Sequence, residues 1–381
     1  MLNSRFIYIL IILLVLLTAC VPTRELERLG IINTYGIDIS NSQDGQIEST
    51  LIVFQFDAQA ENVTKTLSGL GYTVKGAREN ANTKSSYILS PGQVRLMLYG
   101  KEAAEEGIFN YVSPLVRDAR VPATMLLAVT NTTAKEVLTL GQENTSINVG
   151  QYLHDLIEQE YSEDLIPRVT LHDFTHKLAA VGEDPILPVI NLVEDIPQLT
   201  SIGIFKDDKY VEEISIPDAL WLNLFHKRVQ SAPLELRLTR EPFKEYIQSQ
   251  NGPQSDKEDI HIVIDISGSS HTKITHTDEL RYKTDINLEI DLREFSEELM
   301  IEDEQVADVL EKEVERAIKA NYETLLEKLQ EINSDPFGFG QIYRAKNRNS
   351  PLTQDKWREK FPDISVEFNV NVKLKNYGTV K

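Results

Sequence analysis

The chain has 381 residues, of which 41% are hydrophobic and 26% are charged. This balance is typical of a folded globular protein and excludes a disordered tail, a collagen-like fibre and a protein that crosses a membrane many times. With 39 Lys and Arg against 59 Asp and Glu, the formal net charge is −20. Such a chain lacks the clustered cations that nucleic-acid binding requires, and anionic lipid headgroups repel it. Any membrane attachment therefore needs something other than surface charge.

The first twenty residues supply such an attachment. Residues 6–17 form an apolar run that is shorter than the roughly 20 residues of a membrane-spanning helix. The run ends at Leu17-Thr18-Ala19-Cys20, which resembles the bacterial lipobox. We predict a signal peptide over residues 1–19 and acyl chains on Cys20, the only cysteine of the chain. Two or three acyl chains would anchor the acidic body stably; the alternative is a plain signal peptide followed by an unmodified thiol.

The first half of the mature chain alternates between strand and helix patterns. Strand composition on both sides of a turn-like stretch predicts a hairpin of residues 30–40 and 47–56. Further strands are expected at 93–99 and 123–130, and helices at 76–82, 102–117, 133–140, 151–160 and 168–181. This alternation favours an α/β layer with some parallel strand pairing. Three prolines between residues 185 and 197 predict the main boundary. We therefore expect an N-terminal region over 20–195, which could itself hold two subdomains, and a C-terminal domain over 196–381.

The second half is expected to hold a hairpin, alternating strands and one long helix. The hairpin is predicted at 201–205 and 210–214, a helix at 217–229, and strands at 234–238, 260–266, 286–292 and 364–374. Apolar residues at three- and four-residue steps predict a helix over 302–332, about 45 Å long and able to cover a whole sheet. The expected fold class is α+β or mixed α/β, a multi-subdomain ectodomain. Its mixed sheets would carry covering helices, including this long C-terminal helix, after the cleaved signal peptide.

One segment resembles a metal-binding motif. Asp265-Ile266-Ser267-Gly268-Ser269 has the Asp-x-Ser-x-Ser pattern of the adhesion motif in von Willebrand type A domains, where a carboxylate and hydroxyls hold Mg²⁺. The strand before it alternates, as a one-sided antiparallel strand does, whereas that fold needs a strand buried on both faces. Residues 270–278 show no helical period, although the motif should open a helix. We therefore favour a strand that runs into a Gly-Ser turn.

The remaining candidates for chemistry are weak. His172 and His176 are four residues apart on a predicted helix, a spacing that suits zinc, but a third ligand is not evident. His271 and His276 offer still less. Trp221 and Trp357 are expected to be core or interface anchors. The sequence contains no nucleophile elbow, phosphate-binding glycine loop or Cys-x-x-Cys pair, so we expect no catalytic residue, cofactor or metal.

The order of several short segments resembles the Ger(x)C family, the lipoprotein C subunits of spore germinant receptors. The segments are Arg24-Glu25-Leu26, Gly36-Ile37-Asp38, Gly71 to Ala77, Val94 to Gly100, Ala103 to Ile108, Arg117 to Arg120, Asp184 to Pro188, Gly203 to Lys206 with Lys209, Asp335 to Gly340, Trp357 and Phe361-Pro362. Val21-Pro22 replaces a Trp-Asp pair, and Ser90 to Gln93 stand where the family commonly has a His. The resemblance covers nearly the whole mature chain.

The resemblance implies a non-enzymatic subunit on the outer face of the spore inner membrane, in complex with two integral membrane subunits, A and B. It implies a mixed α/β ectodomain, and only Cys20 transfers as a functional site, for lipid attachment. Residues 335–340 are a candidate contact surface, with core packing under the long helix as the alternative. A different function, a solute-binding lipoprotein of a membrane transporter, would need a ligand cleft and a hinge that the chain crosses more than once. The single proline-rich boundary argues against it.

Overall fold

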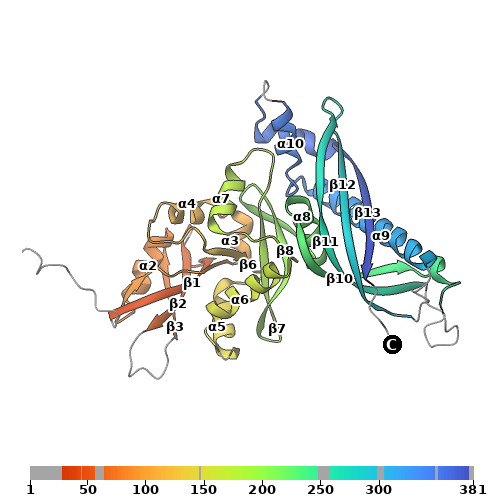
Figure 1. The fold of residues 1–381 in the computed structure, drawn as a ribbon. Coiled ribbons are helices and arrows are strands. Elements are labelled where there is room, and N and C mark those ends of the chain that lie inside the picture. The colour runs from red at the N-terminus through yellow and green to blue at the C-terminus, as the bar shows by residue number, and fades with distance from the viewer. Residues whose placement is uncertain are drawn as a thin grey trace, which may run out of the picture.

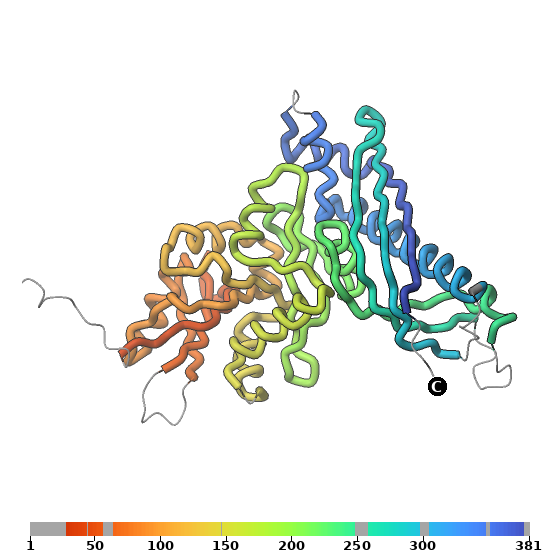
Figure 2. Tube along the Cα trace, in the orientation of Figure 1, coloured from red at the N-terminus to blue at the C-terminus, as the bar shows by residue number. Residues whose placement is uncertain are grey.

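The computed structural model describes residues 28–43, 45–55, 64–145, 147–247, 258–297, 304–347 and 351–376. The predicted signal peptide and Cys20 lie outside these residues, so lipid attachment stays a prediction. Two sheets with covering helices make up the body, and they lie side by side along its long axis (Figures 1 and 2). In the described part of the chain, no helix is both long and apolar enough to cross a membrane. The mixed α/β class expected from the sequence is confirmed.

Nine of the described strands form the first sheet, sheet A, in the order β3-β2-β1-β5-β6-β7-β8-β9, with β4 beside β1. The strands are β1 (Leu29–Ile39), β2 (Ile47–Gln55), β3 (Thr64–Gly71), β4 (Ile88–Ser90), β5 (Leu96–Tyr99), β6 (Leu126–Val129), β7 (Ile186–Val193), β8 (Ile196–Lys206) and β9 (Lys209–Ile214). β1 and β2 pair antiparallel, as the predicted hairpin requires. β1, β5, β6 and β7 pair in parallel, which confirms the predicted parallel layer.

Helices cover both faces of sheet A. They are α2 (Val74–Asn82), α3 (Lys101–Glu106), α4 (Phe109–Val116), α5 (Ala134–Asn144), α6 (Val149–Ser162) and α7 (Leu171–Ala179). Figure 1 shows α4 and α7 above the sheet and α5 and α6 below it. The single helix predicted over 102–117 is wrong in one respect: it is two helices, because Gly107 adopts φ +120° and turns the chain. The predicted hydroxyl cap is confirmed, since the Thr133 side chain accepts from the Glu136 N–H.

The proline-rich segment forms a hairpin of sheet A. β7 and β8 pair antiparallel, and their turn is at Glu194 and Asp195, both with positive φ. Pro188 and Pro197 lie within these strands, where a missing N–H is tolerated if the ladder does not use it. The expected division between residues 195 and 196 falls at this turn. The change from one sheet to the other comes later, after β9, where α8 (Ile216–His226) leads to β10.

The second sheet, sheet B, contains four described strands in the order β10-β11-β12-β13. They are β10 (Val229–Thr239), β11 (Asp259–His276), β12 (Arg281–Phe295) and β13 (Ser365–Asn376). The alternating isoleucines of β11 are buried, and α9 (Glu304–Ile332) packs along the sheet with Val314 and Ile318 fully buried. The prediction of a sheet-covering helix is confirmed. After α9, the chain forms α10 (Phe339–Lys346) and α11 (Gln354–Lys360) before it returns as β13, parallel to β12.

Candidate functional site

The adhesion-type metal motif does not form. Asp265 lies inside β11, which continues to His276, and its carboxylate accepts from the Arg293 guanidinium, Nε to Oδ2 at 2.7 Å. The predicted Gly-Ser turn is also wrong. Gly268 and Ser269 remain paired with Leu288 and Asn287 of β12, so the ladder carries the strand through the sequence that resembled a turn.

The histidine candidates do not gather metal ligands. His172 and His176 lie on α7 with ring centroids 6.3 Å apart. Throughout the described ranges, no group of three or more His, Cys, Asp or Glu side chains could hold a metal ion. His271 and His276 lie in β11, where the His276 ring contacts the Thr275 hydroxyl.

The candidate contact surface at residues 335–340 is buried, so core packing is the correct interpretation. Asp335, Phe337 and Phe339 expose at most 1% of their surface. The Phe337 ring lies 4.8 Å from that of Phe225, and the Phe339 ring lies 5.0 Å from that of Tyr282, centroid to centroid. The segment therefore packs between α8 and sheet B and offers no face to a partner.

The two tryptophans are core anchors, as predicted. Trp221 of α8 is 1% exposed and its ring lies 5.5 Å from that of Tyr322 in α9. Trp357 of α11 is fully buried, and its ring lies 6.0 Å from that of Phe361.

Asp335 organises the turn that follows α9. Its carboxylate accepts from the backbone N–H of Gly338 at 2.9 Å and of Gly340 at 3.0 Å, and from the indole N–H of Trp357 at 3.0 Å. Burial raises the pKa of Asp335 to about 7, although the backbone N–H donors act in the opposite direction. The carboxylate thus ties α10 and α11 to the end of α9.

Asp184 meets this turn from sheet A. Its side chain is 1% exposed and accepts from both terminal nitrogens of Arg358. It also accepts from the backbone N–H of Asp335 at 2.7 Å and of Asp207 at 3.0 Å. A buried charge is costly unless a partner and hydrogen bonds compensate it, and here Arg358 and two N–H donors do so.

We call this set of residues the aspartate junction: Asp184, Asp207, Asp335, Trp357 and Arg358. Asp184 precedes β7 and Asp207 lies at the β8–β9 turn, so both belong to sheet A; Asp335 and Arg358 come from the segment between α9 and β13. Arg358 also donates to the Asp207 carboxylate at 3.0 Å. The junction therefore connects sheet A directly to the C-terminal part of the chain.

Four of the segments that resemble the family are far apart in the sequence and meet at this junction. They are Asp184 to Pro188, Gly203 to Lys206, Asp335 to Gly340, and Trp357. Sequence reasoning did not bring them together. The one local signal was that both central aspartates precede a proline, in Asp184-Pro185 and Asp335-Pro336.

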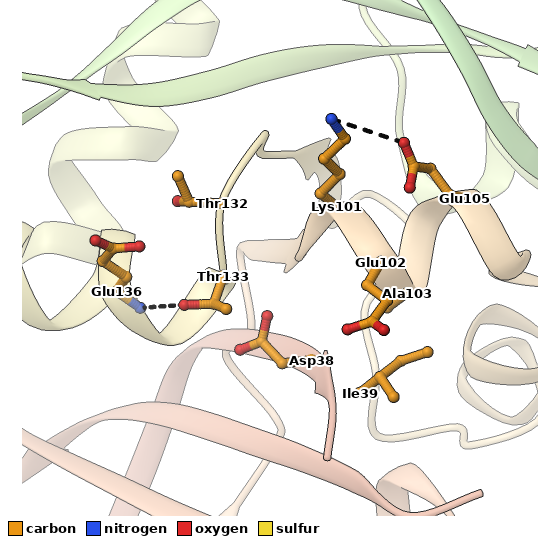
Figure 3. A pocket seen from close by; sticks show the side chains of 9 residues that line it. All are labelled: Asp38, Ile39, Lys101, Glu102, Ala103, Glu105, Thr132, Thr133 and Glu136. Atoms are coloured by element: carbon orange, nitrogen blue, oxygen red, sulfur yellow. Dashed lines mark hydrogen bonds and ion pairs between the residues drawn. The ribbon is translucent and has the colours of Figure 1, made fainter. Parts of the chain in front are cut away.

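A second candidate is a surface hollow of about 280 Å³ at the carboxyl ends of β1, β5 and β6 (Figure 3). The lining residues are Asp38, Ile39, Lys101, Glu102, Ala103, Glu105, Thr132, Thr133 and Glu136. Asp38 accepts from the N–H groups of Ala134 at 2.7 Å and Lys135 at 2.9 Å, which begin α5. Burial raises the pKa of Asp38 to about 6, although these two bonds oppose the shift. The Thr133 hydroxyl in this hollow caps α5, since it accepts from the Glu136 N–H at 3.1 Å.

This hollow lies where open α/β sheets bind ligands. Here, however, the Asp38 carboxylate already occupies the N–H groups of α5, and Lys101 is paired with Glu105 at 3.8 Å. Gly100 permits the arrangement, because an added Cβ would lie 2.0 Å from the Asp38 Oδ1. We interpret Asp38 as a link between β1 and α5.

Fold and site together define a mixed α/β protein of two sheet units held by a buried polar junction. The chain belongs to the Ger(x)C family of spore germination proteins. A family model described as "Spore germination protein N-terminal domain" matches residues 22–192, and one described as "Spore germination B3/GerAC like, C-terminal" matches residues 200–378. The family is not a known enzyme family, and its name points to the spore.

Relatives match over nearly their full length. The chain is 21% identical to spore germination protein GerQC of Bacillus cereus, over 97% of this chain and 98% of that protein. It is also 21% identical to spore germination protein KC of Bacillus subtilis strain 168, over 97% and 95%. The crystal structure of the GerBC protein matches with a TM-score of 0.51 and 14% identity, covering 90% of this chain and 97% of that one, which shows the same fold.

Proposed function

We propose that the chain is the C subunit of a spore nutrient germinant receptor. Acyl chains on Cys20 anchor it to the outer face of the spore inner membrane, where it assembles with the integral A and B subunits. It acts without catalysis, by supporting receptor assembly and the coupling that triggers germination. Family membership, the names of the relatives and the lipobox-like sequence before Cys20 support this proposal.

The observation that carries the scaffold role is the aspartate junction. Its hydrogen bonds join residues that are 151 and 174 positions apart, and its central carboxylates are buried. Removing one partner from such a network leaves a buried charge uncompensated, so the network resists local opening. Two sheet units held in this way present fixed faces, as a subunit that organises other subunits requires.

The alternative, a solute-binding lipoprotein, requires two lobes that open and close around a ligand. In the described part of the chain, sheet A meets the C-terminal segment through buried side chains and ion pairs rather than across an open cleft. We therefore favour the receptor subunit.

Spores carrying a deletion of the gene test the proposal. We expect loss of nutrient-triggered germination, measured as the fall in optical density, together with lower levels of A and B subunits in the inner membrane. The wild-type gene should restore both, and Cys20→Ala should leave the protein outside the membrane fraction. Unchanged germination and unchanged A and B levels in the deletion strain would contradict the proposal.

A further inference from the structure

We propose that β10 pairs with the β10 strand of a second copy of this chain, antiparallel and in a single register, so that sheet B continues from one copy into the other. The register is centred on Leu236 and places Glu235 of each copy opposite Arg237 of the other. The inference goes beyond the proposed function, because it adds a contact between two C subunits. It does not depend on the lipid anchor.

The borders of the two sheets differ in how their outer backbone groups are occupied. Each sheet has two border strands, whose outer N–H and C=O groups have no neighbouring strand to bond. Helix side chains bond to such groups on three of the four: Asn80 on β3 at 3.0 Å, Glu315 on β13 at 2.9 Å and Lys328 on β9 at 2.6 Å. The fourth is β10, at one border of sheet B (Figure 1). Within the described part of the chain, nothing bonds to its outer N–H and C=O groups at residues 233–239, so this border is open to a further strand.

The backbone of β10 shows which groups face outward. The Arg240 N–H donates to the Glu258 carbonyl at 2.9 Å, so the even-numbered residues direct their N–H and C=O groups toward β11. These directions alternate along an antiparallel strand, and the pairing with β11 is regular from residue 232 to 239. The odd-numbered residues therefore direct their groups outward. Pro233, which has no N–H to donate, lies at an odd-numbered position, where a border strand tolerates it.

A second β10 strand fits these outward groups. In an antiparallel pair centred on Leu236, Glu235 and Arg237 of opposite copies form a pair that exchanges two N–H···O bonds. The two-fold axis repeats this pair, and at each end the Thr239 N–H donates to the Pro233 carbonyl of the other copy. The two copies thus use the same surface, as a two-fold interface requires.

The charged side chains select this register over its neighbours. Glu235 and Arg237 of opposite copies attract each other, whereas a slip of two residues in either direction would place Glu235 against Glu235 or Arg237 against Arg237. Within one copy, Glu235 pairs with His261 and Arg237 with Asp259 on the same face. The Glu235 and Arg237 side chains are still 67% and 70% exposed, so each can accept a second partner.

The inner face of β10 is compatible with the same pairing. Leu234, Leu236 and Leu238 are 4%, 5% and 3% exposed on the side of the sheet that α9 covers. In the proposed register Leu234 lies opposite Leu238 of the other copy, and Leu236 lies opposite itself. The row of leucines therefore continues from one copy to the other, and no polar side chain becomes buried on this face.

Disulfide cross-linking at the two ends of the pair tests the proposal with full-length acylated protein in detergent. Pro233→Cys and Thr239→Cys are at exposed positions and leave both charged residues in place. In the proposed register, position 233 faces position 239 of the other copy with Cα atoms about 5.5 Å apart, which a disulfide can bridge. Two copies of position 233 are six residues apart along the strands, roughly 20 Å, which a disulfide cannot bridge.

We expect a disulfide-linked dimer when the two variants are mixed and oxidised, and only the level of the oxidised wild-type protein when either is oxidised alone. Adding Glu235→Arg to both variants places Arg opposite Arg and should lower the yield of mixed dimer about fivefold. Adding Arg237→Glu as well exchanges the charges and should restore the yield. A mixture that gives no more dimer than the separate variants would overturn the inference, and so would a yield that Glu235→Arg leaves unchanged.

Discussion

Asp184 and Asp335, 151 positions apart, bond to each other through main chain and side chain. The Asp184 N–H donates to the Asp335 carbonyl at 2.9 Å, and the Asp335 N–H donates to the Asp184 Oδ2 at 2.7 Å. Each aspartate precedes a proline, which disfavours a helical conformation at the aspartate itself. Two non-helical Asp-Pro turns thus face each other, and each supplies the hydrogen-bond partner that the other lacks within its own segment.

Replacing Arg358 should destabilise the protein strongly. Arg358→Met keeps much of the side-chain volume but leaves the buried Asp184 carboxylate without its cation, which costs about 3–5 kcal/mol. Urea unfolding followed by circular dichroism measures the change. Arg344→Met, which removes an exposed cation that bonds only to Gln341 among the described contacts, is the control and should change stability by no more than about 0.5 kcal/mol. Equal effects of the two substitutions would exclude a structural role for the ion pair.

Gly340 should tolerate no side chain. An added Cβ would lie 2.4 Å from the Gly182 Cα and 2.7 Å from the Trp357 ring, so Gly340→Ala forces two backbone segments apart. We expect a loss of about 1–3 kcal/mol, the usual cost of overpacking. Gly92→Ala is the matched control, because its nearest heavy atom would be 3.9 Å away. Thermal unfolding of both variants provides the comparison, and an unchanged Tm for Gly340→Ala would show that the junction can move apart without cost.

Stability should fall as the pH rises through the neutral range. Burial raises the pKa of Asp335 to about 7 and that of Asp38 to about 6, above the ordinary value of 3.8, so between pH 4 and 7 the folded state binds more protons than the unfolded state. Their contribution is complete below pH 3.8 and is lost as the pH passes 6 to 7. Between pH 5 and pH 8 we expect a loss on the order of 4 kcal/mol in the free energy of unfolding, because each pKa unit corresponds to about 1.36 kcal/mol.

The variant Asp335→Asn separates this effect from the general repulsion of an acidic chain. It should be less stable at every pH, because an amide cannot accept all the N–H groups that face Asp335, and its stability should depend less on pH than that of the wild type. Urea unfolding at pH 5, 6, 7 and 8 measures both slopes. Parallel curves for the two proteins would mean that Asp335 does not titrate in this range.

Local sequence patterns predict some elements of this fold and miss others, depending on whether the element is set by its own residues or by distant partners. The periodicity of residues 302–332 predicts α9, because a helix that covers a sheet has one apolar stripe that local sequence reveals. The Phe-Gly alternation of 335–340 suits a surface loop and a buried turn equally well, and only its contacts with α8 and sheet B decide. The junction depends on partners up to 174 positions apart, and no periodic pattern records such pairs. The sequence favours a turn at Gly268, whereas the structure has a continuous strand there. The difference arises because the pairing of Gly268 with β12 cannot be seen in the local sequence.

Asp38 provides the last prediction, which separates a structural link from a ligand site in the hollow of Figure 3. Asp38→Ala removes the acceptor for two N–H groups at the start of α5 and should lower stability by about 1–2 kcal/mol, as loss of a helix cap does. Glu136→Ala, exposed in the same hollow, should leave stability within about 0.5 kcal/mol of the wild type. Nutrient-triggered germination of spores carrying each variant is the second measurement. A structural link predicts that germination follows the amount of folded protein, so a germination defect in Glu136→Ala at normal protein levels would instead indicate that the hollow binds a ligand.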